Sequence, residues 1–168
     1  MKSFGLNSEV HLPYQKSQQT LVLLHGLTGN LHRWDKYVPR LKEKYTIVTI
    51  DLIGHGESDY PESIEEYSPE SQAKRIQDLL TQLKINDFSL LCHSYSFAIA
   101  LELLQLKKTS ISNFIMLSPY ILKESKGWRI RKGIIKFFMH IWHILPQVAT
   151  QKHFEYPTEA RKITFLDD

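Results

Sequence analysis

A serine at position 94 stands where a short apolar run meets a longer apolar segment. The run 88–92 predicts a buried strand and the segment 94–106 predicts a buried helix. A serine on so sharp a turn projects its hydroxyl above the sheet, beside backbone amides that favour developing negative charge. This is the setting that a nucleophilic serine needs. The simpler alternative is a polar residue that caps the helix.

A second motif, His25-Gly26-Leu27-Thr28-Gly29-Asn30, follows the first strongly apolar run. Glycines at this point let the backbone turn and bring the amide of Leu27 toward the space above the sheet. Together with the amide of Tyr95, it could form an oxyanion hole with two donors. The alternative is an ordinary glycine-rich loop, but the two motifs together are less expected by chance than either alone.

The elements that must position these residues follow from the hydrophobic pattern. Four short apolar runs, at 21–25, 45–51, 88–92 and 113–118, predict strands buried on both faces of a parallel sheet. Helical spacing follows the first run, with Pro39 as a kink or boundary, and precedes the third, where Ser68-Pro69-Glu70 predicts a helix start. Alternating strands and helices predict an α/β fold with a doubly wound, mostly parallel sheet. Ligands of such sheets bind beyond the carboxyl ends of the strands.

The order of these motifs resembles the amino-terminal half of the α/β-hydrolase superfamily, over residues 20 to 120. The resemblance rests on the HG pair after one strand, Trp34 in the next helix, the segment Asp51–Ser58 and the serine turn with its following helix. It implies Ser94 as the nucleophile. It also implies oxyanion donors in the amides of Leu27 and Tyr95, and a structural turn at 51–58.

The same resemblance implies that His25 and His55 shape loops and that neither is the catalytic base. It further implies a hydrolase of small molecules, and we expect an apolar carboxylic ester that is cleaved through an acyl-enzyme on Ser94. A non-catalytic remnant or binding module on the same scaffold is the alternative. The turn departs from the usual G-x-S-x-G-G because Cys92 and Ser96 replace glycines, which predicts crowding around the nucleophile.

The acid and the histidine of such a site follow the serine in the superfamily, and here both are unknown. None of the acids and histidines after Ser118 follows a predicted buried strand. We therefore expect a sheet truncated before its last strands, with weak or no turnover by this chain alone. A less favoured alternative lets a later histidine swing over Ser94; the candidates are His140, His143 and His153. The unpaired sheet edge predicts self-association or a partner that covers it.

The last part of the chain changes in character near residue 121. We predict a hydrolase core over residues 1–120 and the start of a helical cap over 121–168. Segment 127–146 has the pattern of a basic amphipathic helix. We favour a cap over the site rather than an interfacial membrane helix, although the pattern alone fits both.

Composition excludes several other classes of protein. The chain has 168 residues, a net charge of +3 and a single cysteine. The small net charge gives no reason to expect a nucleic-acid partner, and one cysteine excludes an internal disulfide framework or a multi-cysteine metal site. Neither a signal peptide nor a membrane-spanning segment is predicted. We therefore expect a cytoplasmic protein without a cofactor or metal.

Overall fold

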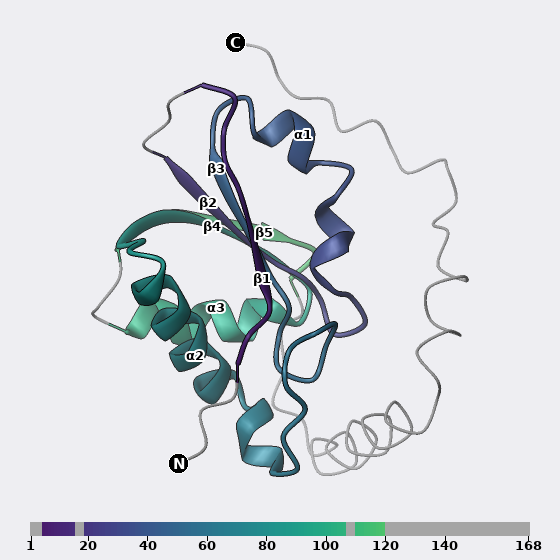
Figure 1. The fold of residues 1–168 in the computed structure, drawn as a ribbon. Helices are drawn as coiled ribbons and strands as arrows, with labels where there is room; N and C mark the ends of the chain where they lie inside the picture. The colour runs from purple at the N-terminus through teal and green to yellow at the C-terminus, as the bar shows by residue number, and fades with distance from the viewer. Residues whose placement is uncertain (1–4, 16–18, 107–109, 120–168) are drawn as a thin grey trace. The chain divides into compact units, whose positions relative to one another are not determined.

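The computed structural model describes residues 5–15, 19–106 and 110–119, and these form a five-stranded sheet in the order β1-β3-β2-β4-β5 (Figure 1). Strands β2, β3, β4 and β5 run parallel to one another, as predicted. Their bounds are Thr20–Leu24 for β2, Thr46–Ile50 for β3, Asp87–His93 for β4 and Ser110–Leu117 for β5. The parallel order brings the carboxyl ends of β3, β2, β4 and β5 to one edge of the sheet.

Strand β1, Ser8–His11, was not predicted. It pairs antiparallel with β3, from Ser8 opposite Ile50 to His11 opposite Ile47. A strand of four residues with mixed polarity carries little hydrophobic signal, so only its pairing with β3 identifies it. The pairing extends past the strand, because Asp51 N–H donates to the Asn7 carbonyl at 2.9 Å.

Helices cover both faces of the sheet, which confirms the doubly wound architecture (Figure 1). Alternate residues of β2 point to opposite faces, as in any strand. Val22 and Leu24 pack with the residues of α2 (Pro69–Gln82) and α3 (Ser96–Gln105), whereas Leu21 and Leu23 pack against Trp34 and the segment that follows it. The apolar runs at β2 and β3 are continuous because both sides of these central strands are buried.

Helix α2 begins where the sequence predicts. The Ser68 side chain accepts a hydrogen bond from Ser71 N–H at 3.2 Å, and Pro69 occupies the first turn. The hydroxyl thereby satisfies one of the amide donors that every helix start leaves open. The short 3-10 helix η2, Ile64–Tyr67, precedes it.

Two predictions about the helices are wrong in part. The segment after β2, predicted to be helical with a kink or boundary at Pro39, forms a 3-10 helix, η1 (Leu31–Trp34), and one turn of α-helix, α1 (Val38–Leu41). Pro39 lies in the first turn of α1, so the boundary is present, but both helical pieces are shorter than predicted. Helix α3 was expected to be buried nearly all round, but Leu101 and Leu104 are 43% and 46% exposed. Only one side of α3 packs against α2 and the sheet, so apolar composition overstated its burial.

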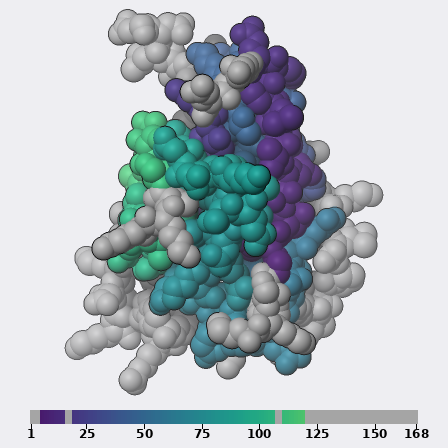
Figure 2. Space-filling view, turned by 60° about the vertical axis from the view of Figure 1, so that its left-hand side comes forward, coloured from purple at the N-terminus to yellow at the C-terminus, as the bar shows by residue number. Residues whose placement is uncertain are grey.

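Strand β5 also departs from the expectation of burial on both faces. Most of its residues are exposed, including the apolar side chains of Ile115, Met116 and Leu117. It is the outermost of the described strands on its side of the sheet, so neighbours cover it less than they cover β2. In Figure 2 the green surface of β5 and the purple surface of β1 lie at opposite sides, with the teal helices between them.

Several predictions fall outside the described residues. They are the domain boundary at 120/121, the helix over 127–146, and His140, His143 and His153. Within the described part of the chain, none of the helices has the length and apolar character needed to cross a membrane.

Candidate active site

Ser94 lies at the turn between β4 and α3, and its backbone adopts the left-handed conformation, with φ at 54°. A side chain that is not glycine rarely takes this conformation, which costs of the order of 1–2 kcal/mol. Ser94 N–H donates to the Leu117 carbonyl at 3.0 Å, and the side chain is half-buried. The predicted sharp turn is therefore present, and the serine is not packed inside the core.

Ser96, which replaces a glycine of the usual motif, is fully buried and is part of the turn. Its hydroxyl accepts from His93 N–H at 3.0 Å and lies 3.1 Å from the carbonyl oxygens of both Leu24 and His93. The hydroxyl proton can go to either carbonyl, so this small polar side chain joins the ends of β2 and β4. The Ser96 side chain is accommodated in this turn by its hydrogen bonds to His93 and Leu24. The sequence alone did not predict this role of Ser96.

Cys92, at the other glycine position, lies within the core. Burial raises the pKa of its thiol to about 11. The thiol is therefore protonated at neutral pH, and a protonated thiol is a poor nucleophile. Between these two residues of the turn, the hydroxyl of the half-buried Ser94 is the better candidate.

Tyr95 begins α3, and its ring extends toward α2. Its hydroxyl donates to the Tyr67 carbonyl at 3.2 Å and accepts from Gln72 Nε2 at 3.3 Å. Burial raises the pKa of this phenol, so it stays a neutral donor. The side chain thus anchors the turn, while the Tyr95 amide has no hydrogen-bond acceptor within the described residues.

The loop 25–30 follows β2, which lies directly beside β4. Gly26 packs against His93, the residue before Ser94: a Cβ at Gly26 would lie 2.8 Å from His93 Nδ1. Only glycine allows so close an approach. The loop that carries Leu27 and the turn that carries Ser94 are therefore in contact, as the predicted site requires. The Leu27 amide, like that of Tyr95, has no acceptor among the described residues.

Arg33 extends from η1 to the same place, with its guanidinium 3.5 Å from His93 Nε2. Burial and this nearby positive charge both lower the pKa of His93. A neutral ring can accept the guanidinium proton at Nε2, which leaves the remaining proton on Nδ1 beside Gly26. No periodic pattern in the sequence indicates this contact, because the two residues come from different elements.

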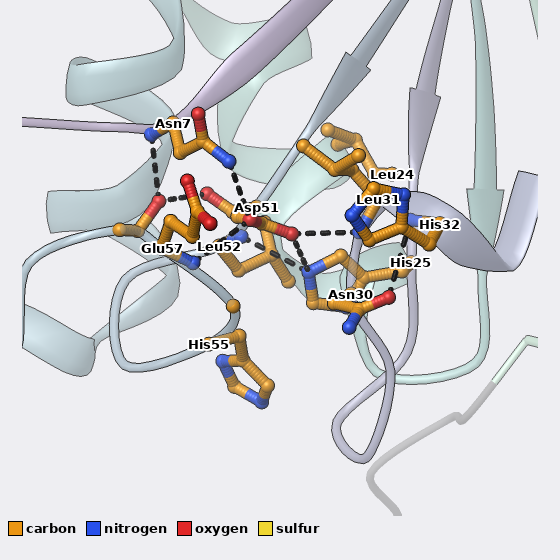
Figure 3. Close-up of polar contacts among 12 residues, drawn as sticks. Asn7, Leu24, His25, Asn30, Leu31, His32, Asp51, Leu52, His55 and Glu57 are labelled. Atoms are coloured by element: carbon orange, nitrogen blue, oxygen red, sulfur yellow. Dashed lines mark hydrogen bonds and ion pairs between the residues drawn. The ribbon is translucent and has the colours of Figure 1, made fainter. Parts of the chain in front are cut away.

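A polar cluster supports these loops at the ends of β2 and β3 (Figure 3). The buried Asp51 carboxylate accepts hydrogen bonds from Leu31 N–H at 2.6 Å, Asn7 Nδ2 at 2.8 Å and Glu57 N–H at 3.0 Å. Ser58 Oγ donates to the Asp51 carbonyl at 2.6 Å. The segment 51–58 is thus a structural turn that ties together three parts of the chain.

His25 is fully buried next to this carboxylate. Its Nδ1 lies 2.7 Å from the Gly26 carbonyl, and its Nε2 accepts from Leu52 N–H at 3.0 Å. Burial, and then the nearby His55, lower the pKa of His25 to about 3. The ring is therefore neutral, with its proton on Nδ1. Both nitrogens are engaged in the loop.

Within the described residues, no three His, Cys, Asp or Glu side chains are grouped so that they could hold a metal ion. The polar groups of the site are instead paired with backbone amides and carbonyls. The chemistry that this arrangement offers is a hydroxyl on a strained turn, with open backbone amides on two adjoining loops.

Comparison with known proteins finds similarity to proteins of one fold family. The profile of the alpha/beta hydrolase fold matches residues 19–142. The chain is 30% identical over 150 residues to a putative 2-succinyl-6-hydroxy-2,4-cyclohexadiene-1-carboxylate synthase of Bacillus subtilis, covering 81% of this chain and 54% of the relative. It is 29% identical over 100 residues to mouse epoxide hydrolase 4, covering 60% of this chain and 28% of the relative.

Among solved structures, an esterase from Exiguobacterium antarcticum superposes with a TM-score of 0.60 at 29% identity, covering 67% of this chain and 41% of the esterase. The chain spans about half or less of the length of these three proteins. Their names describe three different reactions on one fold.

Proposed function

Because the chain belongs to the alpha/beta hydrolase fold family, we propose that Ser94 is the nucleophile of a hydrolase that cleaves carboxylic esters through an acyl-enzyme. The observation that carries this proposal is the left-handed backbone of Ser94, at the turn between β4 and α3. Strain of this kind persists only where the surrounding structure maintains it, and it is concentrated at functional sites.

In the proposed reaction, Ser94 Oγ attacks the ester carbonyl carbon and the carbonyl oxygen becomes an oxyanion. The open amides of Leu27 and Tyr95 donate to that oxyanion. Collapse of the intermediate breaks the bond to the alcohol, and leaves the acyl group on Ser94. Water then attacks the acyl-enzyme, which releases the acid and restores the hydroxyl.

The proton of Ser94 needs a base, and His25 cannot serve. Both of its ring nitrogens are engaged, and burial lowers its pKa to about 3. The base and the acid stay unassigned. A serine hydroxyl without a neighbouring base is a weak nucleophile, so we expect slow turnover or none from residues 1–168 alone.

An apolar small-molecule ester is the substrate class that we propose. The Leu27 side chain is 42% exposed on the loop that carries one proposed oxyanion donor. It offers apolar surface to the acyl or alkyl group of a bound ester. One of the three similar proteins is named an esterase, whereas the names of the other two describe other reactions, so ester chemistry here rests on the serine and the two amides.

The proposal can be tested by labelling the chain with a fluorophosphonate probe over a range of pH. We expect slow labelling of Ser94 that rises with pH without a plateau, and its loss in Ser94→Ala. Ser63→Ala, which changes an exposed serine in another loop, should label at the wild-type rate. A short p-nitrophenyl ester gives the parallel turnover measurement.

Three outcomes contradict parts of the proposal. Equal labelling of wild type and Ser94→Ala excludes Ser94 as the nucleophile. Failure to label at any pH favours a non-catalytic binding module on the same scaffold. Fast labelling that reaches a plateau with pH would show that the chain already contains a base.

A further inference from the structure

The direction of the Leu27 amide is set by the peptide group to which it belongs. That group also contains the Gly26 carbonyl, which lies 2.7 Å from His25 Nδ1 and accepts from Gly29 N–H at 3.0 Å. In a planar trans peptide the N–H points away from the C=O. Two donors on the Gly26 oxygen therefore orient the Leu27 N–H in the opposite direction, but they hold only one of the two peptide groups that flank Leu27. They also polarise the peptide and make its N–H a stronger donor.

The hydrogen bond from His25 Nδ1 to the Gly26 carbonyl is kept over a wide range of pH, because burial lowers the pKa of His25 to about 3. Leu52 N–H occupies Nε2, so the single proton of the neutral ring must lie on Nδ1 and point at Gly26. The ring is fully buried between the loops that follow β2 and β3. One of the two peptide groups that flank Leu27 is therefore held by a hydrogen bond from a buried side chain.

The other flanking peptide group is held by His55. This residue lies between Gly54 and Gly56, which both have positive φ, at 76° and 53°. His55 Nε2 is hydrogen-bonded to the Leu27 carbonyl, and its Nδ1 lies 3.1 Å from the Ile53 carbonyl. The rings of His25 and His55 are 5.1 Å apart. The two imidazole rings thus contact the two peptide groups that flank Leu27, His25 the preceding one and His55 the following one.

We propose that His55 is a positioning residue, which fixes the second peptide group of Leu27 so that the Leu27 N–H stays aimed at the site. The inference rests on the proposed function, in which that N–H stabilises an oxyanion. Leu27 is exposed on its loop, so few packing contacts could replace the bond to His55. Without that bond, the peptide held by His25 would be the only fixed one.

The test combines a measurement on the Leu27 amide with one on Ser94. In His55→Ala we expect the backbone order parameter of Leu27 to fall from about 0.85, typical of a rigid backbone, toward about 0.6. We expect the rate of Ser94 labelling by fluorophosphonate to fall about tenfold, less than the 10²–10³-fold typical for removal of an oxyanion donor. His55→Gln, which keeps an N–H donor, should recover part of both losses.

His32→Ala is the matched control, because His32 is an exposed histidine on the neighbouring η1 and pairs with Asp35 on the surface. It should leave both measurements unchanged, and urea unfolding should show that all variants fold. An unchanged order parameter of Leu27 in folded His55→Ala overturns the inference. If Ser94 does not label in the wild type while the order parameter still falls, the proposed function fails and the positioning role stands.

Discussion

The loops after β2 and β3 are held by the buried Asp51 and His25 side chains, whereas the turns after β4 and β5 each contain a serine with left-handed backbone. In the first region, the Asp51 carboxylate and the His25 ring bond directly to loop amides and carbonyls (Figure 3). In the second, Ser94 and Ser118 both adopt left-handed backbone, with φ at 54° and 46°. The loop that carries the proposed oxyanion donor Leu27 therefore has its support within the described residues, while Ser94, the proposed nucleophile, lies beside a strand with exposed apolar side chains.

The difference separates two tasks of one site. A loop that presents an amide as a donor needs peptide groups of fixed orientation. Buried hydrogen bonds provide this orientation because they restrict the motion of the loop. A serine that must react needs an exposed oxygen on a sharp turn, which strain provides. Four substitutions or changes of condition probe the two regions separately.

The largest effect is expected from Asp51→Asn. The change replaces an acceptor of three hydrogen bonds by an amide that turns an NH₂ group toward backbone donors. We expect the free energy of unfolding, measured with urea, to fall by about 3 kcal/mol, because each buried donor left without an acceptor costs about 1–3 kcal/mol. Asp35→Asn, on an exposed side chain, should cost less than about 0.5 kcal/mol. Equal losses in the two variants would contradict the special role of this cluster.

Acid should lower the free energy of unfolding, because the folded chain keeps His25 unprotonated. Its pKa is about 3 in the folded chain and 6.5 in the unfolded chain, so only the unfolded chain binds the proton between these values. Stability is complete above pH 6.5 and is lost as pH falls, by about 2 kcal/mol near pH 5. The control is His25→Asn, whose stability is lower at all pH values but should fall less steeply over this interval. Parallel curves of unfolding free energy for the two proteins would exclude His25 as the cause.

A smaller effect of opposite sign is expected at the serine turn. Ser94→Gly removes the Cβ from a left-handed residue and should raise the free energy of unfolding by about 1 kcal/mol. Ser94→Ala keeps the Cβ, so it should be near neutral in stability while abolishing labelling. A loss of stability in Ser94→Gly would show that the backbone there is not strained.

The smallest effect on unfolding is expected on β5, where the change should act on association. Met116 is 47% exposed on β5, the outermost of the described strands on its side of the sheet, and the eight residues of this strand carry no charge. Exposed edges of this kind favour association, and a lysine on them opposes it. Met116→Lys should lower the sedimentation-average mass at high protein concentration. Val10→Lys, on β1 at the other edge, should lower it less, because that strand already carries Glu9. An unchanged mass in Met116→Lys would mean that β5 is not the surface of association.

Much of this architecture could be predicted because local patterns matched the final environment. The runs at β2 and β3 are continuous in hydrophobicity since helices bury both faces, and Ser68 precedes a helix that it caps. The wrong predictions arise where the local pattern does not match the final environment of the residues. Strand β1 is too short to carry a pattern, and the apolar residues of α3 and β5 look buried by composition although their neighbours leave them exposed.

The sequence by itself determined the order of strands β2 to β5 and of the helices α2 and α3 between them, and it placed Ser94 and Leu27 after strand ends, because hydrophobic period and turn residues are local properties. Only the tertiary structure decided how the loops are held. Ser96 reaches Leu24, Asp51 reaches Leu31, and His55 reaches Leu27 across 72, 20 and 28 positions of the chain. Such contacts leave no periodic trace, since they depend on which strands become neighbours in the sheet.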